Sequence, residues 1–79
     1  MIIYCIKENS YRFNEYASTE EKYFTKLESA KQYLNLRISE YMSNNGFRLE
    51  LNDDKYKIYD NIDKWHYELY IEYIEVSEE

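Results

Sequence analysis

The chain contains one thiol and one imidazole, Cys5 and His66, which are the groups that form a cysteine nucleophile and its base. If the first and last strands of a sheet were neighbours, the two side chains could approach each other. The sequence offers no third residue to orient the imidazole and no recognisable oxyanion loop. A simpler interpretation makes Cys5 a small core residue and His66 a half-exposed strand residue. We therefore predict no catalytic residues and no enzyme activity.

Acidic turns raise the question of a metal site. Asp53 and Asp54 belong to one turn, and residues 60–63 form another. A calcium loop needs oxygen ligands at alternate positions and a glycine at its sharp bend, but Ile62 occupies a position that should be polar. One histidine and one cysteine cannot complete a tetrahedral zinc site, and one glycine cannot form a glycine-rich phosphate loop. The sequence therefore predicts no metal and no cofactor.

The net charge of the chain is concentrated at its C-terminal end. Residues 60–79 hold seven acids and one base, whereas residues 1–59 hold nine acids and nine bases, so the last segment carries the whole charge of −6. Within it, Glu68, Tyr70 and Glu72 alternate along one face of an expected strand. The two glutamates would lie roughly 13 Å apart, which is about two phosphate steps of a nucleic-acid strand. The alternative is an ordinary solvated face, although lysine is nearly absent from the segment.

We predict that this acidic, tyrosine-rich strand contacts a basic protein, for example an enzyme that binds nucleic acid. The predicted contact residues are Asp60, Asp63, Trp65, Glu68, Tyr70 and Glu72. The carboxylates would steer the encounter, and the aromatic rings would supply the buried contact. Negative charge disfavours direct binding to nucleic acid or to an anionic membrane. Exposed aromatic side chains also allow a homodimer.

Two other functions stay open. Arg12, Arg37 and Arg48, together with nearby tyrosines, could bind an anionic nucleotide by forked hydrogen bonds and ring stacking. The competing interpretation is three scattered surface arginines paired with glutamates. A third hypothesis is a structural module that assembles with itself through the open face of its sheet.

The elements that must position these residues begin with a short apolar run, Ile2–Lys7, which predicts a strand inside the sheet. Asn9 and Ser10 indicate a turn. Residues 11–24 show no clear period, so we expect an irregular hairpin or loop there.

One long helix is expected over residues 26–44. Thr25 and Glu28 fit a capping box at its start, and Gly46 is a natural left-handed residue after its end. The residues at helical spacing form one apolar face, which consists of Leu27, Ala30, Leu34, Ile38 and Tyr41.

Three segments with alternating apolar residues follow the helix, and turns at 52–55 and 60–63 separate them. Leu49 and Leu51 belong to the expected buried face of the first segment. The apolar positions change parity near Tyr73, which indicates a β-bulge. Together the elements predict a single α+β domain spanning 1–79 with the order β-α-β-β-β. Its long helix would cover one face of a four-stranded, mainly antiparallel sheet.

A lone cysteine excludes an intrachain disulfide, and no apolar run approaches the length of a membrane helix, so we expect a cytoplasmic protein. A compact acidic domain without catalytic groups, which carries the aromatic and acidic segment Trp65–Glu75, resembles small phage-encoded inhibitors in general character. Anti-CRISPR proteins belong to that group. The resemblance implies a non-enzymatic inhibitor of a basic host enzyme, such as a CRISPR effector nuclease, inside a bacterial cell. Many such inhibitors imitate DNA electrostatically.

Overall fold

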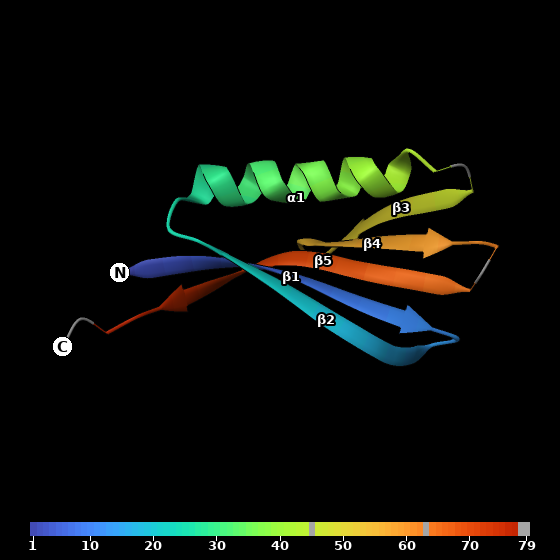
Figure 1. The fold of residues 1–79 in the computed structure, drawn as a ribbon, viewed down its shortest axis with the longest axis horizontal. Coiled ribbons are helices and arrows are strands. Elements are labelled where there is room, and N and C mark those ends of the chain that lie inside the picture. Colours follow the sequence, from blue (N-terminus) through green and yellow to red (C-terminus); the bar gives the residue numbers. More distant parts are fainter. Residues whose placement is uncertain (45, 63, 78–79) are drawn as a thin grey trace.

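A computed structural model describes residues 1–44, 46–62 and 64–77 and shows an α+β fold in two layers (Figure 1). In these residues, helix α1 lies across one face of a five-stranded antiparallel sheet with strand order β2-β1-β5-β4-β3. The helix is Leu27–Met42, and the strands are β1 Ile2–Arg12, β2 Glu15–Phe24, β3 Phe47–Asn52, β4 Lys55–Asp60 and β5 Trp65–Glu75. The predicted class and the single helix-covered sheet are confirmed. The predicted count of four strands is wrong.

Strand β2 takes the place of the expected irregular hairpin. It pairs with β1 from Phe24, opposite Tyr4, to Glu15, opposite Arg12. All its side chains except that of Phe24 are exposed, so β2 has no alternation of buried and exposed positions for a sequence pattern to reveal. Backbone hydrogen bonds to β1, rather than burial, hold this strand in the sheet.

A two-residue turn at Phe13 and Asn14 joins β1 to β2, and the turn expected at Asn9–Ser10 is wrong because these residues lie inside β1. The two turn residues have φ angles of 51° and 64°, the left-handed pair that two-residue hairpins require. Asp53 and Asp54 form the same kind of turn between β3 and β4, with φ angles of 50° and 64°, where a turn was predicted.

Strand β1 pairs with β5 along its whole length and in unbroken register. The β-bulge expected near Tyr73 is therefore wrong. The parity of the apolar residues changes because Ile74 faces the side of the sheet away from the helix, opposite Ile3. With β2 on one side and β5 on the other, β1 lies inside the sheet, as predicted.

The start of β1 and the end of β5 lie side by side at one end of the sheet (Figure 1). The backbone amide of Val76 donates to the carbonyl of Met1 at 2.8 Å, and the Met1 ammonium group donates to the carbonyl of Val76 at 3.3 Å. The pairing of β1 with β5 therefore extends to the first residue of the chain.

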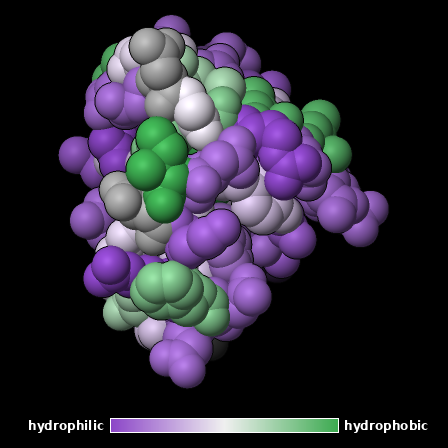
Figure 2. Space-filling view, turned by 90° about the vertical axis from the view of Figure 1, so that its right-hand side faces the viewer, coloured by the Kyte–Doolittle hydropathy of each residue, from purple (hydrophilic) through white to green (hydrophobic). Residues whose placement is uncertain are grey.

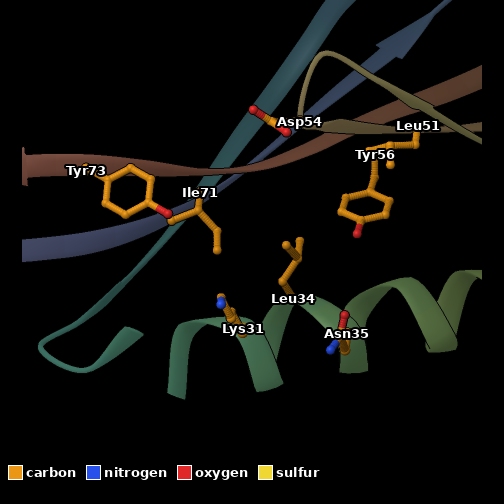
Figure 3. A pocket seen from close by; sticks show the side chains of 8 residues that line it. All are labelled: Lys31, Leu34, Asn35, Leu51, Asp54, Tyr56, Ile71 and Tyr73. Atoms are coloured by element: carbon orange, nitrogen blue, oxygen red, sulfur yellow. The ribbon is translucent and has the colours of Figure 1, made fainter. Parts of the chain in front are cut away.

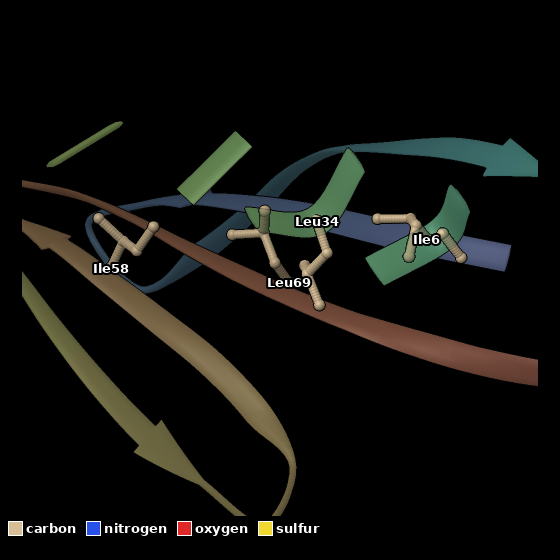
Figure 4. Close-up of a cluster of buried hydrophobic side chains, with 5 residues drawn as sticks. Ile6, Leu34, Ile58 and Leu69 are labelled. Atoms are coloured by element: carbon tan, nitrogen blue, oxygen red, sulfur yellow. The ribbon is translucent and has the colours of Figure 1, made fainter. Parts of the chain in front are cut away.

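The hydrophobic core lies between α1 and the sheet (Figure 4). Its buried residues are Ile6, Ala30, Leu34, Ile58 and Leu69. Partly buried side chains pack around them, including Ile38 and Tyr41 from the predicted apolar face of the helix. Leu49 and Leu51, which were expected to be buried, are 39% and 64% exposed because β3 is the outermost strand.

The start of the helix differs from the prediction. Lys26 is the N-cap, and its side chain makes no capping hydrogen bond. The predicted capping box of Thr25 and Glu28 is wrong because Thr25 lies one residue too early to cap a helix that begins at Leu27. After the helix, Gly46 has a φ of +91°, as its left-handed assignment predicted. No helix in the described part of the chain is long and apolar enough to cross a membrane.

Candidate functional site

The side of the sheet that faces away from α1 is called the uncovered face below. Its side chains come from alternate positions of the strands and include Lys7, Asn9, Tyr11, Lys55, Lys57, Tyr59, His66, Glu68, Tyr70 and Glu72. Among the predicted contact residues, Glu68, Tyr70 and Glu72 lie here in one row along β5. Their alternation in the sequence predicted this common face.

Each glutamate of the row has a lysine from a neighbouring strand beside it. The ammonium nitrogen of Lys7, on β1, lies 2.6 Å from Oε2 of Glu72. Lys55, on β4, lies 3.8 Å from Oε1 of Glu68, and the Asn9 side-chain amide donates to that oxygen at 3.5 Å. The bond to Glu72 raises the pKa of Lys7. The row is therefore part of a mixed-sign surface rather than a continuous negative strip.

Outside the row on β5, the uncovered face also displays aromatic rings. The ring of Tyr11 stacks on that of His66 with centroids 4.6 Å apart, and Tyr59 lies on the other neighbouring strand at 5.7 Å from His66. The ammonium group of Lys55 lies 4.7 Å from the ring centroid of Tyr70. Tyrosine and other large amphipathic side chains are enriched at protein interfaces, where they bury area at a low entropy cost. The uncovered face therefore combines aromatic rings with charged side chains of both signs.

His66 holds its proton weakly in this setting. Burial against its ring neighbours lowers the pKa of the imidazole from its ordinary value of 6.5, and the charge of Lys57 lowers it further. The carboxylate of Glu68 opposes these effects. The neutral ring is therefore the form that the folded protein favours near neutral pH.

Lowering the pH from about 7.5 to about 5.5 should reduce the free energy of unfolding through His66. Between the lowered pKa of the folded state and the ordinary value, the unfolded chain binds more protons, so stability is lost as the pH falls. Urea unfolding at several pH values measures the slope for the natural chain and for His66→Gln. The variant should show a shallower slope. Identical slopes would contradict a neutral, partly buried imidazole.

The other predicted contact residues lie away from this row. Asp60, at the end of β4, is only 9% exposed. Trp65 lies on the side of the sheet that α1 covers, where the Arg12 guanidinium is 5.6 Å from its ring centroid. Asp60 and Trp65 both line a hollow of about 340 Å³ at the end of the sheet. Asp63 lies outside the described residues.

At this end of the sheet, the described residues form no large apolar patch in view (Figure 2). Figure 2 shows a mostly hydrophilic surface with small, separate hydrophobic areas. Phe13 and Ile62, in the connections at this end, are 65% and 72% exposed. Isolated exposed apolar residues are normal on soluble proteins and do not by themselves mark an interface.

The structure does not bring the thiol and the imidazole together. Strands β1 and β5 are neighbours, but Cys5 lies opposite Glu72 whereas His66 lies opposite Tyr11. Six residues of strand separate the two positions by roughly 20 Å. Cys5 is fully buried, and this burial, together with the nearby charge of Glu21, raises the pKa of its thiol. The structure therefore fits the interpretation of Cys5 as a core residue.

The three arginines also have separate surroundings. Arg37 on the helix pairs with Glu8 and Glu40, and Arg48 on β3 lies 2.9 Å from its neighbour Glu50. Each guanidinium also lies over rings of its own surroundings, Arg12 over Phe13 and Trp65, Arg37 over Tyr41, and Arg48 over Tyr59. This arrangement fits the interpretation of scattered arginines and offers no common pocket for an anion.

A buried polar cluster between helix and sheet was not predicted. Glu8, on the covered face of β1, is 7% exposed and accepts hydrogen bonds from Arg37 Nε at 3.0 Å and Arg37 Nη2 at 2.9 Å. The hydroxyl of Tyr41 donates to the same carboxylate at 2.5 Å. The bonds to Glu8 raise the pKa of Arg37, and burial followed by the Glu8 bond raises that of Tyr41. Arg37 and Tyr41 are four residues apart and therefore share one face of the helix, which is the sequence pattern that could have indicated this cluster.

The described residues contain no group of three or more histidine, cysteine, aspartate or glutamate side chains placed to hold a metal ion. Compared with protein-family models, with curated proteins and with solved structures, the chain shows no significant match. Its function must therefore be inferred from its residues and their geometry.

Proposed function

We propose that this chain is a non-enzymatic protein-binding domain that attaches to a positively charged partner through the uncovered face of its sheet. The observation that carries the proposal is the set of aromatic rings displayed there, with Tyr70 between Glu68 and Glu72 and with His66 stacked on Tyr11. A flat array of tyrosine rings with charged neighbours supplies the contact area and the polar partners of a protein interface.

The net charge of −6 favours a basic partner. Because Lys7 and Lys55 lie beside the two glutamates of the row, that charge acts mainly at long range on the encounter, whereas the rings supply the short-range contact. In its narrower form, the proposal is an inhibitor of a nucleic-acid-handling enzyme in the bacterial cytoplasm. The acidic composition and the resemblance to phage-encoded inhibitors support that form.

The proposal is tested by immobilising the chain, exposing it to a bacterial lysate and identifying the retained basic proteins by mass spectrometry. Binding rates are then measured with the purified partner. Tyr70→Ala should raise the dissociation rate about tenfold or more, because a central aromatic side chain is a typical hot spot. Glu68→Gln with Glu72→Gln should mainly slow association, and raising the salt concentration should reduce this difference because charges are screened over about 8 Å at physiological ionic strength.

The matched control is Glu15→Gln with Glu28→Gln. This pair makes the same change in net charge, and both residues are exposed and lie off the uncovered face. It should leave the dissociation rate unchanged and affect association only slightly. If the control pair weakened binding as much as the pair on β5, and Tyr70→Ala had no effect, the uncovered face would not be the contact surface.

A further inference from the structure

Strand β5 has two unequal halves. Its first half, from His66 to Leu69, lies between β1 and β4, where it pairs with Tyr59–Tyr56. Beyond Leu69, the described residues give β5 pairing partners on β1 only. Residues 70–75 therefore form a further sheet edge, in addition to the outer edges at β2 and β3. Alternate residues of such an edge direct their N–H and C=O groups outward, where they can bind another strand.

A hollow of about 540 Å³ lies beside this edge, where an extension of β4 would run (Figure 3). Lys31, Leu34 and Asn35 of α1 border it on one side, Ile71 and Tyr73 of β5 on another, and Leu51, Asp54 and Tyr56 of the β3–β4 hairpin on the third. Its apolar floor continues the core, because Leu34 is a core residue and Ile71 packs against the core. An apolar side chain that entered the hollow would extend this packing.

The outer edges of the sheet have features that discourage strand addition, and residues 70–75 share only some of them. Strand β2 has a register shift opposite Ser10 and Tyr11 and exposes charged residues such as Glu20 and Lys22. Strand β3 is only six residues long. Bulges, charges and short length are the usual protection of edge strands. The 70–75 segment is as short as β3 and carries Glu72 and Glu75, but it is regular, contains four tyrosine and isoleucine residues, and has neither lysine nor proline.

We infer that residues 70–75 of β5 bind an extended strand of the positively charged partner, with an apolar side chain in the hollow. Side chains of the added strand that face the helix would lie beside Ile71 and Tyr73 and should be apolar. Those on the uncovered face would lie beside Glu72, where cross-strand pairing favours a basic residue. This inference rests on the proposed function, which supplies the positive charge of the partner. The edge at 70–75 adjoins the uncovered face, so one partner could contact both.

Charge also distinguishes this occupant from a second copy of the chain. Two copies would each bring a net charge of −6. A symmetric pairing centred on Glu72 would place that glutamate opposite itself, which is unfavourable. Asp54 and Lys31 both line the hollow, and Glu75 adds a further exposed acid at the edge, so the balance of charge opposes self-pairing and favours a basic strand.

The probe is a capped eight-residue peptide that alternates lysine and valine, titrated into the ¹⁵N-labelled chain. Amide shifts and slowed amide exchange should appear at residues 70–75 and around the hollow. The matched peptide that alternates glutamate and valine should bind about tenfold more weakly or less. Two further peptides carry N-methyl groups on every valine or on every lysine. Since alternate amides of a strand point to opposite edges, one methylated peptide should bind and the other should fail.

The matched protein variants are Asn35→Trp, which fills the hollow from an exposed helix position, and Gln32→Trp, which places the same ring on an exposed position outside the hollow. The first should weaken peptide binding about tenfold or more, and the second should leave it unchanged. Equal binding of both methylated peptides would overturn the inference, because it would show docking by side chains alone. So would a free chain that sediments as a dimer with protected amides at 70–75, since the occupant would then be a second copy.

The same experiment separates this inference from the proposed function. Shifts confined to His66, Glu68 and the rest of the uncovered face, with no effect of Asn35→Trp, would overturn strand addition and leave the face as the contact surface. Binding at 70–75 that is insensitive to the charge of the peptide would support strand addition but contradict the basic partner. Absence of binding by any of the peptides at millimolar concentration would overturn the inference, whereas the rates measured for Tyr70→Ala would still decide the proposed function.

Discussion

Replacement of Leu34 by alanine should lower the free energy of unfolding by about 2–4 kcal/mol. Leu34 is 6% exposed and belongs to the small buried cluster with Ile6, Ile58 and Leu69. Removal of its branched end leaves a cavity that the single helix cannot close without losing its other contacts. The loss is a large part of the roughly 4–12 kcal/mol that a domain of this length possesses. Equilibrium unfolding in urea measures it.

Leu36→Ala is the matched control, because it makes the same change on the same helix at a position that is 55% exposed. Its effect should stay within about 0.5 kcal/mol. Similar losses in the two variants would contradict the packing of the Leu34 face of α1 against the sheet.

Arg37→Met should destabilise the fold by about 2–4 kcal/mol. The variant keeps most of the apolar stem, but among the described residues of the helix it leaves the buried carboxylate of Glu8 with the hydroxyl of Tyr41 as its remaining hydrogen-bond donor. An uncompensated buried charge is far more unfavourable than a lost surface ion pair. The expected value lies below that of a fully buried pair because the Arg37 side chain is 24% exposed. Urea unfolding at neutral pH checks it.

Arg48→Met is the matched control, because it removes an ion pair with the same distance between its charged atoms. Arg48 and Glu50 lie 2.9 Å apart, as do Arg37 and Glu8, but the side chains of the control pair are 57% and 45% exposed. Loss of the ion pair between Arg48 and Glu50 should lower the free energy of unfolding by less than about 1 kcal/mol. The double variant Glu8→Met with Arg37→Met should recover most of the stability lost in Arg37→Met, because no buried charge is left unpaired. A double variant less stable than Arg37→Met would show that the polar cluster itself stabilises the fold.

The parts of the fold that were predicted are those in which burial imposes a period on the sequence. The face that contains Ala30 and Leu34 predicted helix α1, and Asp53–Asp54 between two alternating segments predicted the hairpin of β3 and β4. Strand β2 could not be found in this way, since its side chains are exposed on both sides. Phe13 also gave no turn signal, because phenylalanine rarely adopts the left-handed conformation that it has there.

Only the part of the candidate site that lies within a single strand could be predicted from the sequence. Alternation along β5 predicted the common face of Glu68, Tyr70 and Glu72. The lysine beside Glu72 is Lys7, from the opposite end of the chain, so a count of charges within the C-terminal segment could not reveal that neighbour. The unpaired edge at 70–75 depends in the same way on the length and register of β4, which pairs with β5 only up to Leu69.

The place of β1 between β2 and β5 determines when the sheet can be completed during synthesis on the ribosome. Strand β1 can pair with β5 only after β5, the last strand, has been translated. The hydrogen bonds between Met1 and Val76 join residues that are 75 positions apart. Until β5 has been translated, no strand joins the β1–β2 hairpin to the β3–β4 hairpin, and only α1 can contact both. Such long-range closure slows folding and leaves apolar strands exposed in the nascent chain. The native sheet can therefore be completed only after β5 has left the ribosome.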